Sequence, residues 1–101
     1  MLQMTRDDAL EILRAHKDEL KAAGVRSLRI FGSMARDEAG PESDIGLEAA
    51  FEEPSALTIL DLVRPERHLA DLLGRKVELI QQGTFKEGVR ESVEAEAVFA
   101  F

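Results

Sequence analysis

The sequence predicts an α/β fold with a small β-sheet, and three observations support this. Stretches with the helical repeat of apolar residues alternate with short runs in which every second residue is apolar. The resulting order is helix, strand, short helix, strand, helix, strand, helix, which is typical of helices packed on a sheet. A length of 101 residues suits one domain with a single modest core, which we expect over residues 1–101.

The first helix is predicted to begin at Thr5 and to end at Gly24. Thr5 and Asp8 have the spacing of a capping pair, and a glycine often follows the last turn of a helix. Neither His16 nor His68 has neighbours at the spacing of metal ligands, so we expect both to be packed or solvated rather than catalytic. Six side chains fall on one stripe of this helix: Ala9, Ile12, Leu13, His16, Leu20 and Ala23.

Two strands and a short helix are predicted next. Residues 27–31 alternate as a strand, and a short helix is expected over 33–38, directly after a glycine. A Gly-Pro pair at 40–41 marks the following loop. The second strand is predicted over 44–51, and its alternation separates two sets of side chains: Ile45, Leu47 and Ala49 on one face, and Asp44, Gly46 and Glu48 on the other.

A second long helix is predicted over 58–73, followed by a strand over 76–80 and a last helix over 84–96. Pro65 interrupts the hydrogen bonding of the long helix at a typical cost of ~3 kcal/mol, so we expect a kink or a restart there. The apolar segment 97–101 is unusual for a terminus. It either docks on the domain or joins the surface of a partner.

The composition excludes several classes of function. A net charge of −7 argues against general nucleic-acid binding and suits a basic partner protein instead. The absence of cysteine excludes disulfides and thiolate zinc sites. No apolar run reaches the roughly 18 residues of a membrane span and no signal peptide is evident, so we expect a cytoplasmic protein without membrane contact. The small size suggests that it works with a partner or as a homo-oligomer.

The stretch from Gly32 to Leu47 carries the pattern that points to chemistry. Gly32 and Ser33 directly follow an apolar run, and ten residues separate this pair from Asp44. A Gly-Ser turn lets backbone N–H groups approach a phosphate closely, and the positive end of a helix beginning there would add to the attraction. Asp44 would supply a carboxylate to a metal ion bound to that phosphate. Taken alone, the dipeptide is an ordinary strand-to-helix turn with a serine N-cap, and the functional interpretation depends on the residues that accompany it.

This pattern resembles the signature of the minimal nucleotidyltransferases, small relatives of the palm domain of DNA polymerase beta. In that signature Gly-Ser, ten intervening residues and an Asp-x-Asp pair mark the active site. The resemblance covers nearly the whole chain and includes the run 72–80, where Glu78 stands on the strand that carries the family's third acidic residue. It implies a mixed sheet with helices mainly on one face, and a site where Gly32-Ser33, Asp44 and Glu78 converge.

The reaction of this family moves an NMP group from a nucleoside triphosphate to an acceptor and releases pyrophosphate. Two divalent ions held by carboxylates clamp the attacking and leaving oxygens, so catalysis rests on positioning and charge neutralisation. The resemblance implies ATP as the substrate and Mg²⁺ or Mn²⁺ as the cofactor. It divides the site residues into two sets: Gly32, Ser33, Arg36 and Ser43 for nucleotide binding, and Asp44 and Glu78 for catalysis and metal binding.

Gly46 departs from the family pattern, because it stands where the second aspartate of the pair is expected. Glycine has no side-chain oxygen, so a second ion would have little to hold it. Glu48 lies on the same strand face and is a candidate replacement ligand, although it stands roughly 7 Å beyond Gly46. The alternative for Glu48 is a place on a solvated face. Glu78 is a milder departure, being one methylene longer than aspartate.

Each remaining site residue also has a structural interpretation. Arg36 is either a phosphate contact and loop brace or a surface ion-pair partner. Ser43 is either a nucleotide-binding group or a cap for the loop before the strand. Arg75 and Lys76 either steer an anionic nucleotide or complement the dipole at a helix end.

Two functions from different classes follow. The first is a metal-dependent adenylyltransferase that modifies a protein hydroxyl, which by resemblance would be an antitoxin paired with a helical toxin of the HEPN type. The second is a binding module with the same fold, in which the loss of a carboxylate at Gly46 has removed catalysis and left partner binding.

Overall fold

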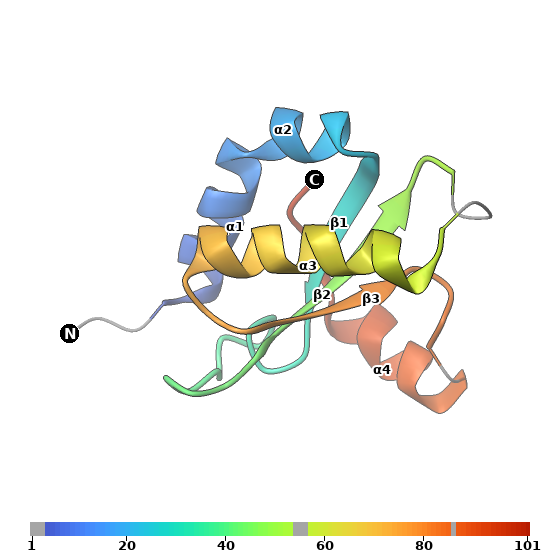
Figure 1. Cartoon of the computed structure of the whole chain (residues 1–101). Coiled ribbons are helices and arrows are strands. Elements are labelled where there is room, and N and C mark those ends of the chain that lie inside the picture. Colours follow the sequence, from blue (N-terminus) through green and yellow to red (C-terminus); the bar gives the residue numbers. More distant parts are fainter. Residues whose placement is uncertain (1–3, 54–56, 86) are drawn as a thin grey trace.

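The computed structural model describes residues 4–53, 57–85 and 87–101, and within them the chain folds around one mixed sheet (Figure 1). The helices and strands follow in chain order: α1 Arg6–Ala15, α2 Lys17–Ala22, β1 Val25–Phe31, β2 Ile45–Phe51, α3 Ile59–Leu73, β3 Val77–Gln81, α4 Glu87–Glu96 and β4 Val98–Phe99. None of the helices in these ranges is long and apolar enough to cross a membrane.

The sheet has four strands in the order β3-β2-β1-β4. β1 pairs with both β2 and β4 in antiparallel orientation, whereas β2 and β3 run parallel. The parallel pair is joined by α3, because parallel strands need a long crossover connection. The mixed sheet is therefore confirmed, and each predicted strand lies within two residues of its observed bounds.

One face of the sheet is the core. Leu28 and Ile30 of β1 lie opposite Ala49 and Leu47 of β2, and these side chains are fully buried. Helices α1, α2 and α3 cover this face, as Figure 1 shows, and contribute six further core side chains: Ala9, Leu10, Leu13, Leu20, Leu69 and Leu73. α4 contacts the opposite face through an ion pair between Arg29 and Glu94. The expectation of helices mainly on one face is confirmed.

The predicted first helix is divided into α1 and α2 at His16. Thr5 caps α1 as predicted, with reciprocal hydrogen bonds to Asp8. His16 leaves helical geometry, with φ −105° and ψ 15°, and its N–H bonds to the carbonyl of Leu13. The break lets each short helix pack its own buried residues against the sheet. The prediction of one continuous helix was therefore wrong.

The two histidines share one carboxylate. Glu19 Oε2 lies 3.1 Å from His16 Nδ1 and 2.9 Å from His68 Nε2, so the start of α2 is tied to the middle of α3. These side chains are partly exposed, as expected for residues without a catalytic role. The hydrogen bond from His68 is the main cause that holds the pKa of Glu19 below its ordinary value of 4.5.

We therefore expect the Glu19 carboxyl to titrate with a midpoint below 4.5 in an NMR titration of side-chain carbons. Replacing His68 with asparagine should raise that midpoint more than replacing His16 does. A lowered folded pKa means that the stabilisation from this contact is fully present above pH 4.5 and is lost as the pH falls through the folded pKa. A midpoint unchanged by His68→Asn would contradict the assignment.

α3 runs without interruption through Pro65, so the prediction of a restart there was wrong. Apolar side chains on both sides of the proline pack on the core, among them Leu62, Leu69 and Leu73. This packing holds the helix together at the position where one backbone hydrogen bond is lost. The predicted cap at Thr58 and Asp61 is present, and Gly74 ends the helix in the left-handed conformation with φ 65°.

The apolar segment 97–101 docks on the domain, which was one of the two expected outcomes. β4 pairs with β1, and the backbones of Ala100 and Phe101 exchange hydrogen bonds with Leu28. Arg14 of α1 donates to the carbonyls of Phe99 and Ala100 at 3.0 and 2.9 Å. A helix at one end of the chain thus fixes the strand at the other end.

Two contacts near β3 and α4 were not predicted. The N–H of Leu79 in β3 donates to the carboxylate of Glu66 in α3 at 3.2 Å. Thr84 donates its hydroxyl to the carbonyl of Gln81 at 2.7 Å, so it closes the turn after β3. The observed α4 begins three residues later than predicted, at Glu87, because Thr84 belongs to this turn and does not cap the helix.

Candidate functional site

The candidate site begins with the segment that follows β1. Residues 32–37 form turns, so the short helix expected over 33–38 was wrong. The N–H of Arg36 bonds to the carbonyl of Gly32, and the N–H of Glu38 reaches back to Ser33 at 2.8 Å. Asp37 has a positive φ of 58°, which ends the turn after one winding. The dipole of a regular helix is therefore not available here.

Glycine is required at position 32 by the backbone. Gly32 has φ +75°, a conformation that residues with a Cβ rarely adopt. A Cβ built there would meet no atom within 4 Å, so the turn faces open space. The next residues, Met34 and Ala35, are buried and anchor the turn to the core. Gly32 and Ser33 thus form an accessible backbone turn on a fixed base.

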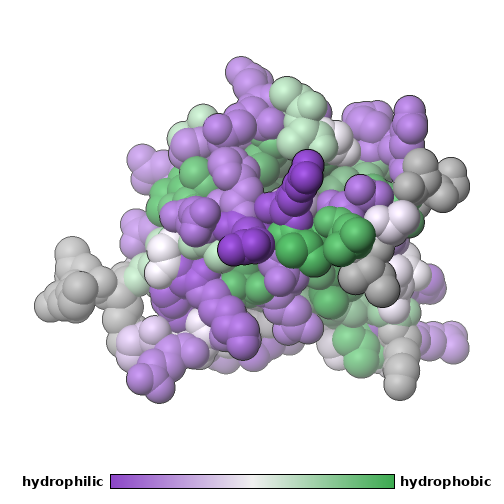
Figure 2. Space-filling view, in the orientation of Figure 1, coloured by the Kyte–Doolittle hydropathy of each residue, from purple (hydrophilic) through white to green (hydrophobic). Residues whose placement is uncertain are grey.

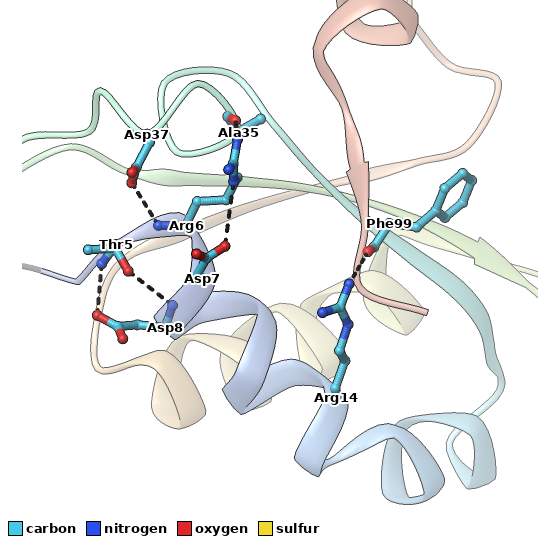
Figure 3. Close-up of polar contacts among 8 residues, drawn as sticks. All are labelled: Thr5, Arg6, Asp7, Asp8, Arg14, Ala35, Asp37 and Phe99. Atoms are coloured by element: carbon cyan, nitrogen blue, oxygen red, sulfur yellow. Dashed lines mark hydrogen bonds and ion pairs between the residues drawn. The ribbon is translucent and has the colours of Figure 1, made fainter.

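Arg6, at the start of α1, braces this turn from below. Its backbone N–H donates to the carboxylate of Asp37 at 2.9 Å, and its guanidinium donates to the carbonyl of Ala35 at 3.1 Å (Figure 3). Figure 3 also shows the capping pair of Thr5 and Asp8 beside these contacts. No local pattern predicts the pairing of Arg6 with Asp37, because the two residues are separated by 31 positions.

Glu78 and Asp44 flank Gly46 on the sheet face opposite the core. Glu78 on β3 is the register partner of Gly46 on β2. Asp44 immediately precedes β2 and, by strand alternation, lies on the same face roughly 7 Å along the strand. Both side chains are exposed. The topology thus brings Asp44 and Glu78 to the sheet end where the Gly32 turn leaves β1.

An aromatic ring occupies the space above Gly46. Phe31 is the register partner of Gly46 on β1, and a Cβ built on Gly46 would lie 2.8 Å from the ring of Phe31. Real Cβ atoms do not approach that closely, so the ring must move to admit any side chain at this position. Phe31 meets Phe85 edge to face, with ring centroids 5.2 Å apart. The place expected for a second carboxylate is therefore covered by the ring of Phe31.

Glu48 is not available as a replacement ligand. It is 4% exposed and accepts a hydrogen bond from Arg29 Nε at 2.6 Å. Arg29 also bonds to Glu94 of α4 and stacks over Phe99 at 5.4 Å. Its hydrogen bonds to Glu94 are the largest cause of the raised pKa of Arg29, and Arg29 in turn lowers the pKa of Glu94. Both interpretations of Glu48, as a ligand and as a solvated residue, were wrong.

Arg36 and Ser43 both make contacts within the fold, and their role in nucleotide binding stays a prediction. Arg36 pairs with Glu38 at 3.0 Å and with Glu96 at 2.8 Å, so it braces the turn and ties it to the end of α4. The hydrogen bond to Glu38 is the main cause of its raised pKa. The hydroxyl of Ser43 accepts from the N–H of Gly40 at 3.1 Å and closes the loop before β2.

Arg75 and Lys76 face the loop that carries Asp44. Arg75 donates to the backbone carbonyls of Gly40 and Ser43, which is neither of the two roles considered for it. Lys76 is 81% exposed, and its Nζ lies 3.9 Å from Asp44 Oδ2. A charge this exposed contributes little to stability.

The donor set suits one divalent cation and not two. Mg²⁺ is usually held by one or two carboxylates together with substrate phosphates, and Asp44 and Glu78 can supply those carboxylates. A second ion needs a further ligand between them, where Gly46 has no side chain and the ring of Phe31 lies. Within the described ranges no three histidine, aspartate or glutamate side chains converge as a metal site.

A separate hollow lies at the other end of the sheet. It has a volume of about 430 Å³ and is lined mainly by α2, the end of β2 and α3, including Leu20, Phe51 and Pro65. Figure 2 shows hydrophobic residues gathered over the first half of α3, where Leu60 is 77% exposed. Neither Asp44 nor Glu78 lines this hollow, and the carboxylate that does line it is Asp61. The hollow is therefore separate from the candidate site.

Sequence comparison gives a consistent result over most of the chain. A family model described as "Nucleotidyltransferase domain" matches residues 11–100. The protein adenylyltransferase MntA of Thermococcus cleftensis is 39% identical over 101 residues, which cover 98% of this chain and 99% of that protein.

Two solved structures have the same fold. One, described as a "putative minimal nucleotidyltransferase", has a TM-score of 0.70 and 35% identity, with 97% of this chain and 98% of that chain covered. The other contains the AMPylated HEPN toxin of Shewanella oneidensis in complex with an MNT antitoxin, and it matches with a TM-score of 0.65. It covers 91% of this chain and 71% of that chain, and its 14% identity supports the fold alone.

Proposed function

Because this chain belongs to the nucleotidyltransferase domain family, we propose that it transfers AMP from ATP to a hydroxyl group of a protein. The observation that carries the proposal is the arrangement of the accessible Gly32 turn, Asp44 and Glu78 at one end of the sheet. The identity to an adenylyltransferase over almost the full length of both chains supports the same reaction.

The acceptor in this proposal is a helical toxin of the HEPN type, for which the chain serves as antitoxin. A structural neighbour is an MNT antitoxin in complex with an AMPylated HEPN toxin. The net charge of −7 favours a basic partner surface and disfavours direct binding of nucleic acid.

The residues of the chain would divide the work as follows. The Gly32–Ser33 turn holds the triphosphate, and Asp44 and Glu78 hold one Mg²⁺ or Mn²⁺, which neutralises phosphate charge when bound. The acceptor hydroxyl oxygen would form a bond to the α-phosphorus and give up its proton to water. The bond from that phosphorus to the oxygen that bridges it to the β-phosphorus would break and release pyrophosphate. Catalysis then rests on positioning by the chain, with weaker charge neutralisation than two ions would give.

A binding module is the second candidate function, and a specific observation favours it. Gly46 supplies no ligand, and the ring of Phe31, which packs edge to face against Phe85, covers its position. In this alternative the chain neutralises its toxin by contact, without transferring AMP.

The substitution Asp44→Asn separates these two functions. We expect it to reduce the transfer of radiolabelled AMP from ATP to the toxin by roughly 100-fold, the scale on which loss of one charge-stabilising group acts. Glu42→Gln, an exposed carboxylate in the same loop, is the matched control and should retain full transfer. Toxin binding that persists while neither the unaltered chain nor its variants transfer AMP would instead favour the binding module.

In the proposed site Arg36 would also contact phosphate, and Glu96 would then compete for its guanidinium. Glu96→Gln removes one of the two carboxylates on the Arg36 guanidinium and leaves Glu38 in place. Since exposed pairs contribute about 0–1 kcal/mol, we expect ATP to bind up to about fivefold more tightly in this variant. Isothermal titration with ATP and Mg²⁺ measures the change, and Glu91→Gln on the same helix is the control. Unchanged or weaker binding in Glu96→Gln would argue against contact between Arg36 and phosphate.

A further inference from the structure

Arg75 occupies an unusual place between α3 and the loop before β2. Gly74 ends α3 in the left-handed conformation and turns the chain, so that Arg75 follows at once. The half-buried guanidinium of Arg75 then donates through Nη2 to the carbonyl of Gly40 at 2.7 Å and to that of Ser43. One side chain thus spans both ends of the loop 40–43.

The segment between α3 and β3 also holds Ile45, the residue that follows Asp44. The N–H of Ile45 donates to the carbonyl of Lys76 at 2.9 Å. Within the loop, the N–H of Ser43 bonds to the carbonyl of Gly40 at 3.2 Å, and the hydroxyl of Ser43 accepts from Gly40. Two backbone groups therefore flank Asp44 and are bonded to consecutive residues. The carbonyl of Ser43 accepts from Arg75, and the N–H of Ile45 donates to Lys76.

We infer that Arg75 is a positioning residue for Asp44. It fixes the backbone on the N-terminal side of Asp44 while the Lys76 carbonyl fixes the other side. Asp44 is thereby held on the sheet face that carries Glu78 on the adjacent strand. The inference rests on the proposed function, in which Asp44 is a metal ligand. The partners that orient a metal ligand contribute to metal affinity, even though they do not touch the ion.

The chemistry of the guanidinium explains why arginine suits this position. Its planar, permanently charged fork presents several N–H donors in fixed directions, so one nitrogen can serve two carbonyls. A lysine ammonium retains the charge but loses the fixed geometry. A methionine retains most of the length of the side chain and removes every donor. The contact with the carbonyls of Gly40 and Ser43 is therefore expected to weaken from arginine to lysine and to be lost with methionine.

The test compares Arg75→Lys and Arg75→Met with the unaltered chain. Titration of Mg²⁺ at fixed ATP gives the Mg²⁺ concentration at half-saturation of ATP binding, which we expect to rise about tenfold in Arg75→Met and less in Arg75→Lys. Hydrogen exchange at the amides of Ser43 and Ile45 should become faster in the same order. Arg67→Met, on the exposed side of α3, removes the same charge and is the control for both measurements.

The two readouts separate the inference from the proposed function. If the unaltered chain does not bind ATP with Mg²⁺, the proposed function fails, and exchange still reports whether Arg75 holds the loop. If exchange at Ser43 and Ile45 and the Mg²⁺ requirement in Arg75→Met both match the Arg67→Met control, the positioning role is overturned. A melting temperature lowered without any change in the Mg²⁺ requirement would also overturn it, because that result describes a residue that only stabilises the fold.

Discussion

Replacing Arg29 with methionine is expected to lower the free energy of unfolding by about 3–5 kcal/mol, the range for removing one partner of a buried ion pair. Glu48 is 4% exposed and would lose its charged partner in the interior. The substitution also removes the two hydrogen bonds to Glu94 and the stacking over Phe99. Urea denaturation followed by far-ultraviolet circular dichroism measures this loss.

The control for Arg29→Met is Arg26→Met, which removes an exposed charge from the same strand and should change stability by less than about 0.5 kcal/mol. Adding Glu48→Leu to Arg29→Met removes the unpaired carboxylate and should restore much of the lost stability, because an apolar pair can replace a buried ion pair. If Arg29→Met has no larger effect than Arg26→Met, the network does not hold the second face of the sheet together.

The substitution Gly46→Asp is expected to destabilise the chain without Mg²⁺ and to increase Mg²⁺ affinity once the ring of Phe31 has room to move. The new Cβ lies 2.8 Å from that ring, and forcing such a contact typically costs about 1–3 kcal/mol. The introduced carboxylate also stands between Asp44 and Glu78, which adds repulsion between like charges when no cation is bound.

A smaller residue at position 31 separates the two effects. In Gly46→Asp with Phe31→Leu, we expect the Mg²⁺ concentration at half-saturation of ATP binding to fall about tenfold relative to the unaltered chain, and AMP transfer to increase. Gly46→Ala is the matched control, since it introduces the Cβ without a carboxylate and should be destabilised without any gain in Mg²⁺ affinity. If the double variant neither binds Mg²⁺ more tightly nor transfers AMP faster, the missing carboxylate does not limit this site.

The sheet and its core could be predicted from the sequence because their signal is local. Ile45, Leu47 and Ala49 alternate with smaller or polar residues, and this repeat indicates which side of the strand packs against the apolar core. The Gly-Ser spacing located the turn and Asp44 in the same way. The helix predicted over 33–38 was wrong although its apolar residues Met34 and Ala35 are compatible with a helix. The positive φ of Asp37 ends the segment as a turn instead.

The contacts that shape the candidate site were missed because they join residues far apart in the chain. Arg29 lies between Leu28 and Ile30 in an apolar strand, which is a signal that its charge needs a buried partner, but nothing local identifies Glu48. The position of the Phe31 ring over Gly46 depends on the register of two strands joined by a thirteen-residue connection. Such pairings follow from topology and from side-chain packing, not from spacing along the chain.

The hydrogen bond from Leu79 to Glu66 has a consequence for how copies of this chain behave when crowded together. An outer strand with free N–H and C=O groups is a template on which another chain can add a strand, and this is a common start of aggregation. Glu66 occupies a central donor of β3 and places a charged side chain at that border. The opposite border is formed by β4, which has only two residues and offers little length for pairing. Both borders of the sheet are thus poor sites for edge-to-edge growth.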